Sequence, residues 1–174
     1  MSIRGMHHTA IIVRDLDRSI YFYHDLLGLD LTQEPSDWME GDDLARGTGV
    51  PGARLRNALL RIGSEATLEL LEYANRPADN VAPPAQNRLG AMHLALRVDD
   101  IVGKKAELEE GGVEFLADIS GFDEGALAGW RWVYFHDPDG IPLELVEVAY
   151  SNERERRARI AEYLAQRPAL ASLT

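Results

Sequence analysis

The chain has 174 residues with 29 acidic and 18 basic side chains, a formal net charge of -11, and no cysteine. This charge argues against nucleic acid as a partner, because phosphate contacts need clustered Lys and Arg, and the lack of cysteine excludes disulfides, thiolate metal sites and a cysteine nucleophile. Hydrophobic residues make up 45% of the chain without a run long enough for a membrane span or a signal-peptide core, so we expect a soluble cytoplasmic protein of one or two domains.

The first predicted elements are a strand, a helix and a second strand. Residues 6–13 are β-branched and apolar, as in a half-buried strand. Asp15 or Asp17 can cap a helix over 18–27, whose apolar residues form one stripe. Residues 29–32 predict a short strand that follows it.

A segment rich in glycine, proline and acidic residues follows at 33–52. We expect a long loop with one helical turn there, which is either a functional lid or a mobile surface insertion. Strands are predicted over 53–62 and 66–73. The proline-rich stretch at 76–86 then predicts a linker.

The same order of elements returns in the second half. The predicted elements are a strand (92–98), a helix (101–110), a short strand (113–117), a glycine-rich loop (120–129) and two strands (130–135 and 141–148). Each half therefore contains a strand, a helix and three further strands, which indicates an internal duplication.

The duplication defines the predicted domain organisation of an α+β fold. We expect a first βαβββ module at 1–75, a linker at 76–90 and a second βαβββ module at 91–150. The tail at 151–174 is rich in Arg and Glu, with apolar residues at helical spacing. It predicts a helix that lies on the surface or docks on a second subunit.

Two histidines and two glutamates occupy matching places in the two halves. His8 and His93 lie in the first predicted strands, and Glu69 and Glu144 lie between leucines in the last. A carboxylate in an apolar strand costs several kcal/mol unless it is paired or binds a cation. One divalent cation between the halves would satisfy all four side chains.

Each of these residues also has a structural interpretation when taken alone. A histidine in a strand is usually hydrogen-bonded within the fold, and we interpret His7 in this way because alternation sends it to the face opposite His8. A glutamate in an antiparallel sheet usually faces water. Glu72 and Glu147, three residues after the candidate ligands, are interpreted as surface charges at strand ends.

Four segments resemble the vicinal oxygen chelate superfamily, which includes glyoxalase I, methylmalonyl-CoA epimerase, extradiol dioxygenases and metal-free antibiotic-binding proteins. The segments are MHHTAIIVRDLDRSIYFYHDLLGLDL, ATLELLEY, MHLALRVDD and FHDPDGIPLELVE, and the DPDG turn is a specific marker. The resemblance covers roughly residues 6–148. It implies two tandem βαβββ modules that form an open, cup-shaped mixed sheet around one metal.

The resemblance further implies a ligand set of His8, Glu69, His93 and Glu144, like that of glyoxalase I. Epimerases of the family usually have glutamine at the second position, dioxygenases generally use two histidines and one glutamate, and the antibiotic-binding proteins have generally lost the ligands. We expect one divalent ion per chain, Zn, Ni, Co, Mn or Fe. We also expect a homodimer, because the cups of this family often need a second subunit to close.

The leading hypothesis is a metal-dependent isomerase, epimerase or glyoxalase-type lyase that works through a metal-stabilised enolate. Its substrate would be a small molecule with vicinal or carbonyl oxygens. Glu144 is the first candidate for the catalytic base and Glu69 is the second. Arg97 is expected on the face of His93, where it would pair with a substrate anion or form a salt bridge at the rim.

Two alternatives use the same fold. One is an Fe(II) extradiol-type dioxygenase, with Tyr134 and His136 as acid and base, although His136 precedes a turn and is expected to be exposed. The other is a non-catalytic small-molecule-binding (resistance) protein. In that protein Trp38, Trp130 and Trp132 would be stacking platforms, whereas ordinary packing is their simpler interpretation.

Overall fold

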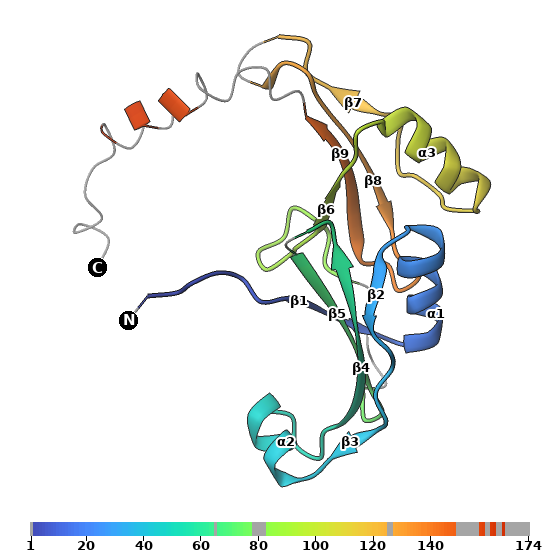
Figure 1. Cartoon of the computed structure of the whole chain (residues 1–174), viewed down its shortest axis with the longest axis vertical. Helices are drawn as coiled ribbons and strands as arrows, with labels where there is room; N and C mark the ends of the chain where they lie inside the picture. Colours follow the sequence, from blue (N-terminus) through green and yellow to red (C-terminus); the bar gives the residue numbers. More distant parts are fainter. Residues whose placement is uncertain are drawn as a thin grey trace.

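The computed structural model describes residues 2–64, 66–77, 83–124 and 127–148, together with five positions of the tail. The strands form two mixed sheets, one from each half of the chain, and the helical segments at 16–26 and 101–110 lie on the same side of both (Figure 1). The predicted α+β class is therefore confirmed. Most of the predicted tail helix lies outside the described residues. None of the described helices has the length and apolar character needed to span a bilayer.

The first sheet has the strand order β1-β5-β4-β2. β1 (Thr9–Val13) runs parallel to β5 (Ala66–Tyr73), whereas β4 (Arg54–Ile62) is antiparallel to both β5 and β2 (Asp30–Gln33). Because β1 pairs only with β5 among the described strands, its other edge carries no strand partner there. β1 also begins later than predicted, so the histidines of the first half precede the strand.

The first helical segment consists of α1 (Leu16–Ile20) and η1 (Tyr21–Leu26), a wider π-helical stretch. The Asp15 side chain caps α1 by accepting the backbone N–H of Arg18 at 3.0 Å. Gly28, with φ of 81°, follows the segment in a conformation that favours glycine. The predicted helix is thus confirmed, but it begins earlier and widens after its first turns.

The segment at 33–52 is more regular than predicted. It contains β3 (Met39–Glu40), which extends the first sheet beside β4, and α2 (Asp42–Thr48). Gly41 and Gly49 flank α2 with positive φ, and Gly49 ends it in the left-handed conformation. The glycines that suggested a loop therefore serve as the boundaries of a short helix.

The second sheet has the order β6-β9-β8-β7. β6 (Leu94–Arg97) runs parallel to β9 (Pro142–Val148), β8 (Trp130–His136) is antiparallel to β9, and β7 (Ser120–Gly121) pairs with β8. α3 (Ile101–Glu110) connects β6 to the rest of this half. As in the first sheet, the first and last strands of this half pair in parallel. Among the described strands, β6 pairs only with β9, so its outer edge carries no strand partner there.

One predicted strand is reduced to a single bridge. In place of a strand at 113–117, Phe115 alone pairs with Phe135, and their rings pack 5.1 Å apart. The edge position in this sheet is taken instead by β7, in the stretch predicted as a glycine-rich loop. The strand prediction was wrong because the segment pairs with β8 at a single bridge, supported by the hydrogen bond from the Leu116 N–H to the Tyr134 carbonyl, and does not continue as a ladder.

A buried contact joins the two halves. The Tyr23 hydroxyl donates to Asp137 Oδ2 at 3.0 Å, and the Arg14 backbone N–H donates to Asp139 Oδ2 at 2.7 Å. Asp137 Oδ1 accepts the backbone N–H groups of Asp139 and Ile141. Burial raises the pKa of Asp137, while these donors act in the opposite direction. The DPDG turn is therefore an attachment point for the first half, and one apolar core runs through both halves.

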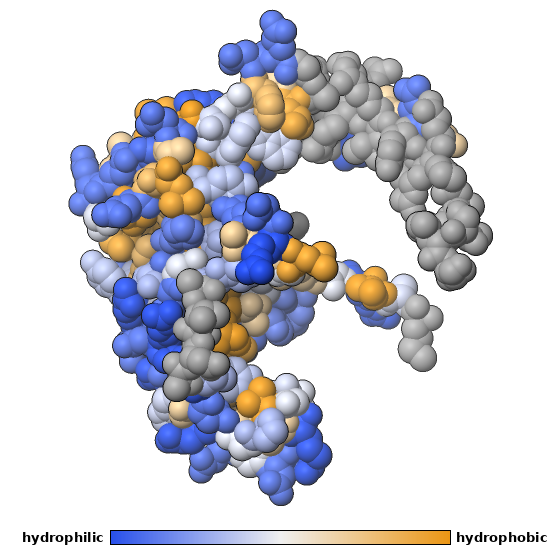
Figure 2. Space-filling model, turned by 180° about the vertical axis from the view of Figure 1, so that it is seen from behind, coloured by the Kyte–Doolittle hydropathy of each residue, from blue (hydrophilic) through white to orange (hydrophobic). Residues whose placement is uncertain are grey.

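The first residues leave the body as an extended arm on the side of the sheets opposite α1 and α3 (Figure 1). Residues 2–8 of this arm have no regular secondary structure. Ile3 and Met6 are 96% and 73% exposed, and Figure 2 shows apolar side chains along the arm. The arm carries His8 at the point where it joins β1.

Two glutamates interpreted as surface charges instead hold the helices on the sheets. Glu72 accepts the backbone N–H of Leu16 at the start of α1, and Glu147 accepts that of Ile101 at the start of α3, each at 2.9 Å. An arginine of the neighbouring strand pairs with each glutamate. The interpretation was wrong because the sequence does not show that both face a helix N-terminus, where a carboxylate is favoured.

We predict that Glu147→Ala lowers the free energy of unfolding by about 1–3 kcal/mol, because it leaves a helix N–H and an arginine without their carboxylate. Urea unfolding followed by circular dichroism measures this loss. Glu34→Ala, in an exposed loop position, is the matched control. Equal stability of the two variants would contradict the role of Glu147.

Candidate metal centre

The candidate glutamates lie on the sheet faces opposite the helices. Glu69 is placed between two fully buried leucines of β5, and Glu144 between two fully buried leucines of β9. Because side chains alternate along a strand, the leucines enter the core and the carboxylates point to the other face. Ala10 lies beside Glu69 and Ala95 beside Glu144, so each carboxylate has a small neighbour on the parallel strand.

Each glutamate is paired with the histidine that precedes the first strand of its own half. His8 Nε2 lies 3.2 Å from Glu69 Oε2, and His93 Nε2 lies 3.1 Å from Glu144 Oε2. The carboxylate side chains are 16% and 11% exposed, whereas the imidazoles are 39% and 40% exposed. Both halves therefore present the same arrangement, a shielded carboxylate below an accessible imidazole.

We call His8 with Glu69 the first half-site, and His93 with Glu144 the second half-site. In the described part of one chain, no three His, Asp or Glu side chains are grouped so that they could hold a metal ion. Imidazole nitrogen and carboxylate oxygen are donors suited to borderline divalent cations. Each half-site thus fits such an ion chemically but supplies two donors, and the predicted four-ligand set stays a prediction.

The first half-site has a second partner that the sequence did not reveal. Asn57 of β4 donates its Nδ2–H to Glu69 Oε1 at 2.7 Å. The Asn57 backbone exchanges hydrogen bonds with Ser36, and its Oδ1 lies 3.4 Å from Gln33 Nε2. A polar residue at an alternating position of a predicted strand was the available signal, but only the register shows what it meets.

In the second half-site the additional partner is Tyr134. It lies directly opposite Glu144 in the register of β8 and β9, so the two side chains share one face of the sheet. Its ring meets the His93 ring edge-on at 5.5 Å between centroids. Burial raises the pKa of the Tyr134 hydroxyl, and the negative charge of Glu144 raises it further. Tyr134 therefore remains a protonated donor at neutral pH.

The other residues considered for the site are placed differently. His136 is exposed at the end of β8, and His7 lies beside His8 in the arm, with 2.8 Å between their Nδ1 atoms. Arg97 lies across from Val146, two positions beyond Glu144, and so shares the face of the second half-site. Three arginines of β4 form ion pairs with acidic neighbours; they are Arg54, Arg56 and Arg61.

The tryptophans divide between the two halves. Trp38 lies under two arginines of β4, with the Arg54 guanidinium 4.7 Å from the ring centroid. Trp130 and Trp132 alternate with buried residues of β8 and are half-buried on the face of Tyr134. Phe122 packs against Trp132 with the ring centroids 5.0 Å apart. The second half-site thus lies beside a row of aromatic side chains.

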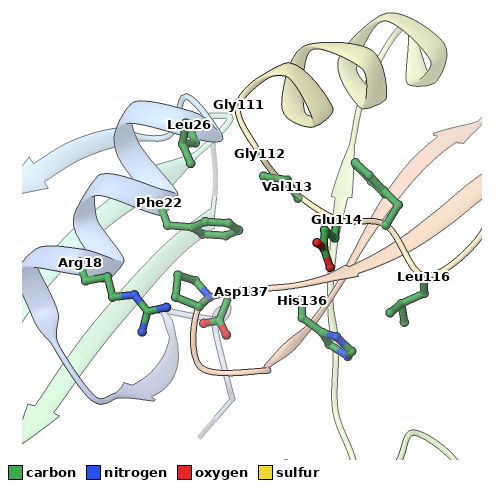
Figure 3. Close-up of a pocket in the computed structure, with 12 residues that line it drawn as sticks. Arg18, Phe22, Leu26, Gly111, Gly112, Val113, Glu114, Leu116, His136 and Asp137 are labelled. Atoms are coloured by element: carbon green, nitrogen blue, oxygen red, sulfur yellow. The ribbon is translucent and has the colours of Figure 1, made fainter.

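A pocket of about 370 Å³ lies elsewhere, between η1, the end of α3 and the turn after β8 (Figure 3). Phe22, Gly112 and His136 are among its lining residues, and none of the four candidate ligands is. It lies at the junction of the two halves and is separate from both half-sites.

Comparison with known proteins shows that one family model matches most of the chain. The model of the Glyoxalase/Bleomycin resistance protein/Dioxygenase superfamily matches residues 5–145, a range that includes all four candidate ligands. A 2-epi-5-epi-valiolone epimerase of an Actinomyces species is 34% identical over 161 residues, which cover 91% of this chain and 87% of the relative.

Two further proteins extend the comparison. The lactoylglutathione lyase of Pseudomonas aeruginosa is 28% identical, and the match covers 86% of each chain. A crystal structure of a glyoxalase family protein from Bacillus cereus superposes with a TM-score of 0.73 at 23% identity, covering 85% of this chain and 96% of that one. This structure supports the fold, and the two named enzymes show that relatives of the chain are an epimerase and a lyase.

Proposed function

The chain belongs to the Glyoxalase/Bleomycin resistance protein/Dioxygenase superfamily, and we propose that it is a divalent-metal-dependent isomerase, epimerase or glyoxalase-type lyase. The observation that carries the proposal is the repeated half-site, an imidazole nitrogen within 3.2 Å of a shielded carboxylate oxygen in each half. The names of the relatives support the same reaction classes. The proposed substrate is a small molecule with carbonyl or vicinal oxygens.

We propose that the metal site is completed by a second copy of the chain. Each half-site supplies two donors, whereas a divalent ion of this class needs more than two protein ligands to be held firmly. β1 and β6, which follow the two histidines, are both edge strands of their sheets. An isologous dimer pairs the first half-site of one copy with the second half-site of the other.

Exposed apolar side chains near the two histidines favour such a dimer. Ile3, Met6 and Ile12 are 96%, 73% and 46% exposed around the first half-site, and Leu89 and Met92 are 106% and 76% exposed before the second. A second copy that covers these side chains removes apolar surface from water. Two-fold symmetry then gives two sites per dimer, which agrees with one ion per chain.

The proposed chemistry is proton transfer at a carbon next to a carbonyl. A bound divalent cation would act as a Lewis acid and stabilise the negative charge that develops on the carbonyl oxygen. Glu144 takes the proton as the C–H bond breaks, and the electron pair of that bond moves toward the carbonyl group. Inversion of the carbon needs a second group, Glu69, that gives a proton to the opposite face of the planar enolate, whereas return of the same proton by Glu144 to the neighbouring carbon gives an isomer. Glu69 is the second candidate for this base.

The metal proposal predicts about one divalent ion per purified chain and clearly less in His93→Ala and in Glu144→Ala, because each variant loses a ligand. Plasma mass spectrometry of protein incubated with Co²⁺ and then desalted measures the content. His136→Ala, an exposed histidine outside both half-sites, is the matched control. A metal-free parent chain, or equal loss in His136→Ala, would contradict the proposed ligands.

The proton-transfer proposal predicts that the metal-loaded protein places deuterium from D₂O on carbon in at least one class of carbonyl substrate. Ketones, 2-oxo thioesters and hemithioacetals are the classes to test by NMR. Glu144→Gln should slow the exchange by about 10²- to 10⁴-fold, since it removes the base, whereas Glu34→Gln should not.

Failure to exchange with every class would overturn the enolate chemistry. Oxygen uptake on a catechol that depends on Fe(II) would instead support the dioxygenase alternative. Tight binding of an aromatic ligand by the metal-free protein, without turnover, would support the binding protein.

A further inference from the structure

The two half-sites repeat their histidine and glutamate but not the group that holds the glutamate from the other side. In the first sheet, Leu59 lies directly opposite Glu69. The corresponding position in the second sheet, opposite Glu144, is Tyr134. The first half-site obtains its additional hydrogen bond from Asn57, which lies two residues before Leu59 in β4. The two carboxylates therefore differ in their surroundings even though their ligand geometry is the same.

Glu69 is contacted at both carboxylate oxygens, and one of the two partners is itself held in place. Its Oε2 contacts His8, and its Oε1 accepts the Asn57 amide at 2.7 Å. Asn57 is fixed in turn, because its backbone is bonded to Ser36 and its Oδ1 faces Gln33. An amide N–H only donates, so it supports a carboxylate but cannot accept a proton from it. Glu69 is thus suited to remain in place as a ligand.

Glu144 meets a different chemical group. The Tyr134 hydroxyl is a donor and also an acceptor, and its O–H bond can rotate. It can donate to the Glu144 carboxylate before proton transfer and accept from the carboxylic acid afterwards. The Tyr134 ring packs edge-on against His93, which places Tyr134 beside the second half-site. Glu144 can therefore change protonation state without losing its second partner.

Building on the proposed function, we propose that Asn57 and Tyr134 are positioning residues that divide the work of the two glutamates. Asn57 fixes Glu69 as the permanent metal ligand, and Tyr134 supports Glu144 as the one carboxylate that takes the substrate proton and returns it to the neighbouring carbon, the isomerase or lyase form of the proposed reaction. The difference between Asn57 and Tyr134, rather than a difference between the two histidine–glutamate pairs, then determines which glutamate moves the proton.

The test compares Asn57→Leu with Tyr134→Phe in two measurements. Isothermal titration of the metal-free protein with Co²⁺ gives the metal Kd, and deuterium exchange at saturating Co²⁺ gives kcat and KM. Asn57→Leu should raise the Kd about 10- to 100-fold, the usual effect of losing an outer partner of a ligand, and this rise should exceed its loss in kcat. Tyr134→Phe should show the reverse order, with about a 10- to 100-fold lower kcat, a smaller rise in Kd and an unchanged KM.

Matched controls separate these effects from general damage. Tyr73→Phe removes a hydroxyl from a half-buried tyrosine of β5, and Asn75→Ala removes an exposed amide of the following turn. Circular dichroism verifies folding, and Asn57→Ala replaces Asn57→Leu if the larger side chain is not accommodated. The inference is overturned if Asn57→Leu and Tyr134→Phe both change the Co²⁺ Kd most, or both change kcat most. It is also overturned if Tyr134→Phe lowers kcat no more than Tyr73→Phe does.

The parent protein distinguishes this outcome from failure of the proposed function. A parent that binds Co²⁺ and exchanges deuterium, with variants that do not divide between Kd and kcat, contradicts the positioning roles alone. A parent that neither binds Co²⁺ nor exchanges deuterium contradicts the proposed function, and it contradicts the separate roles of the two glutamates as well.

Discussion

A carboxylate among leucines on an apolar strand must find a partner, and this requirement organises both sheets. β5 and β9 each carry two such glutamates three residues apart, so alternation sends one to each face. On the helix face, Glu72 and Glu147 bond the first amides of α1 and α3 and hold the helices on the sheets. On the other face, Glu69 and Glu144 meet imidazoles. The strands that build the core therefore also build the half-sites.

The arrangement of the two halves determines how these half-sites can be used. The halves are joined on the helix side, where Tyr23 and Arg14 reach the DPDG turn and one apolar core crosses the junction. The edge strands β1 and β6, with the histidines at their starts, have no strand partner at their outer edges among the described residues. A site that needs both half-sites is therefore proposed to form between chains. The exposed apolar arm near His8 is consistent with such a contact.

Patterns of neighbouring residues predicted an element correctly where those residues alone determine its two ends. β5 and α3 have the predicted bounds, because alternation defines the strand and Asp100 caps the helix. The starts of β1 and β6 were predicted too early, since a strand begins where its neighbour offers hydrogen bonds. The pairing of each histidine with the glutamate of its own half follows from the duplication. The partnership of Asn57 with Glu69 does not, because it depends on the register of β4 against β5.

A purified heterodimer tests most directly whether two chains share one metal site. One chain carries His8→Ala with Glu69→Ala, the other carries His93→Ala with Glu144→Ala, and two affinity tags isolate the mixed species. In an isologous dimer one site keeps all four ligands and the other keeps none, so we predict about one Co²⁺ per heterodimer and almost none in either homodimer. A heterodimer that binds no Co²⁺, beside a parent that does, would contradict the shared site.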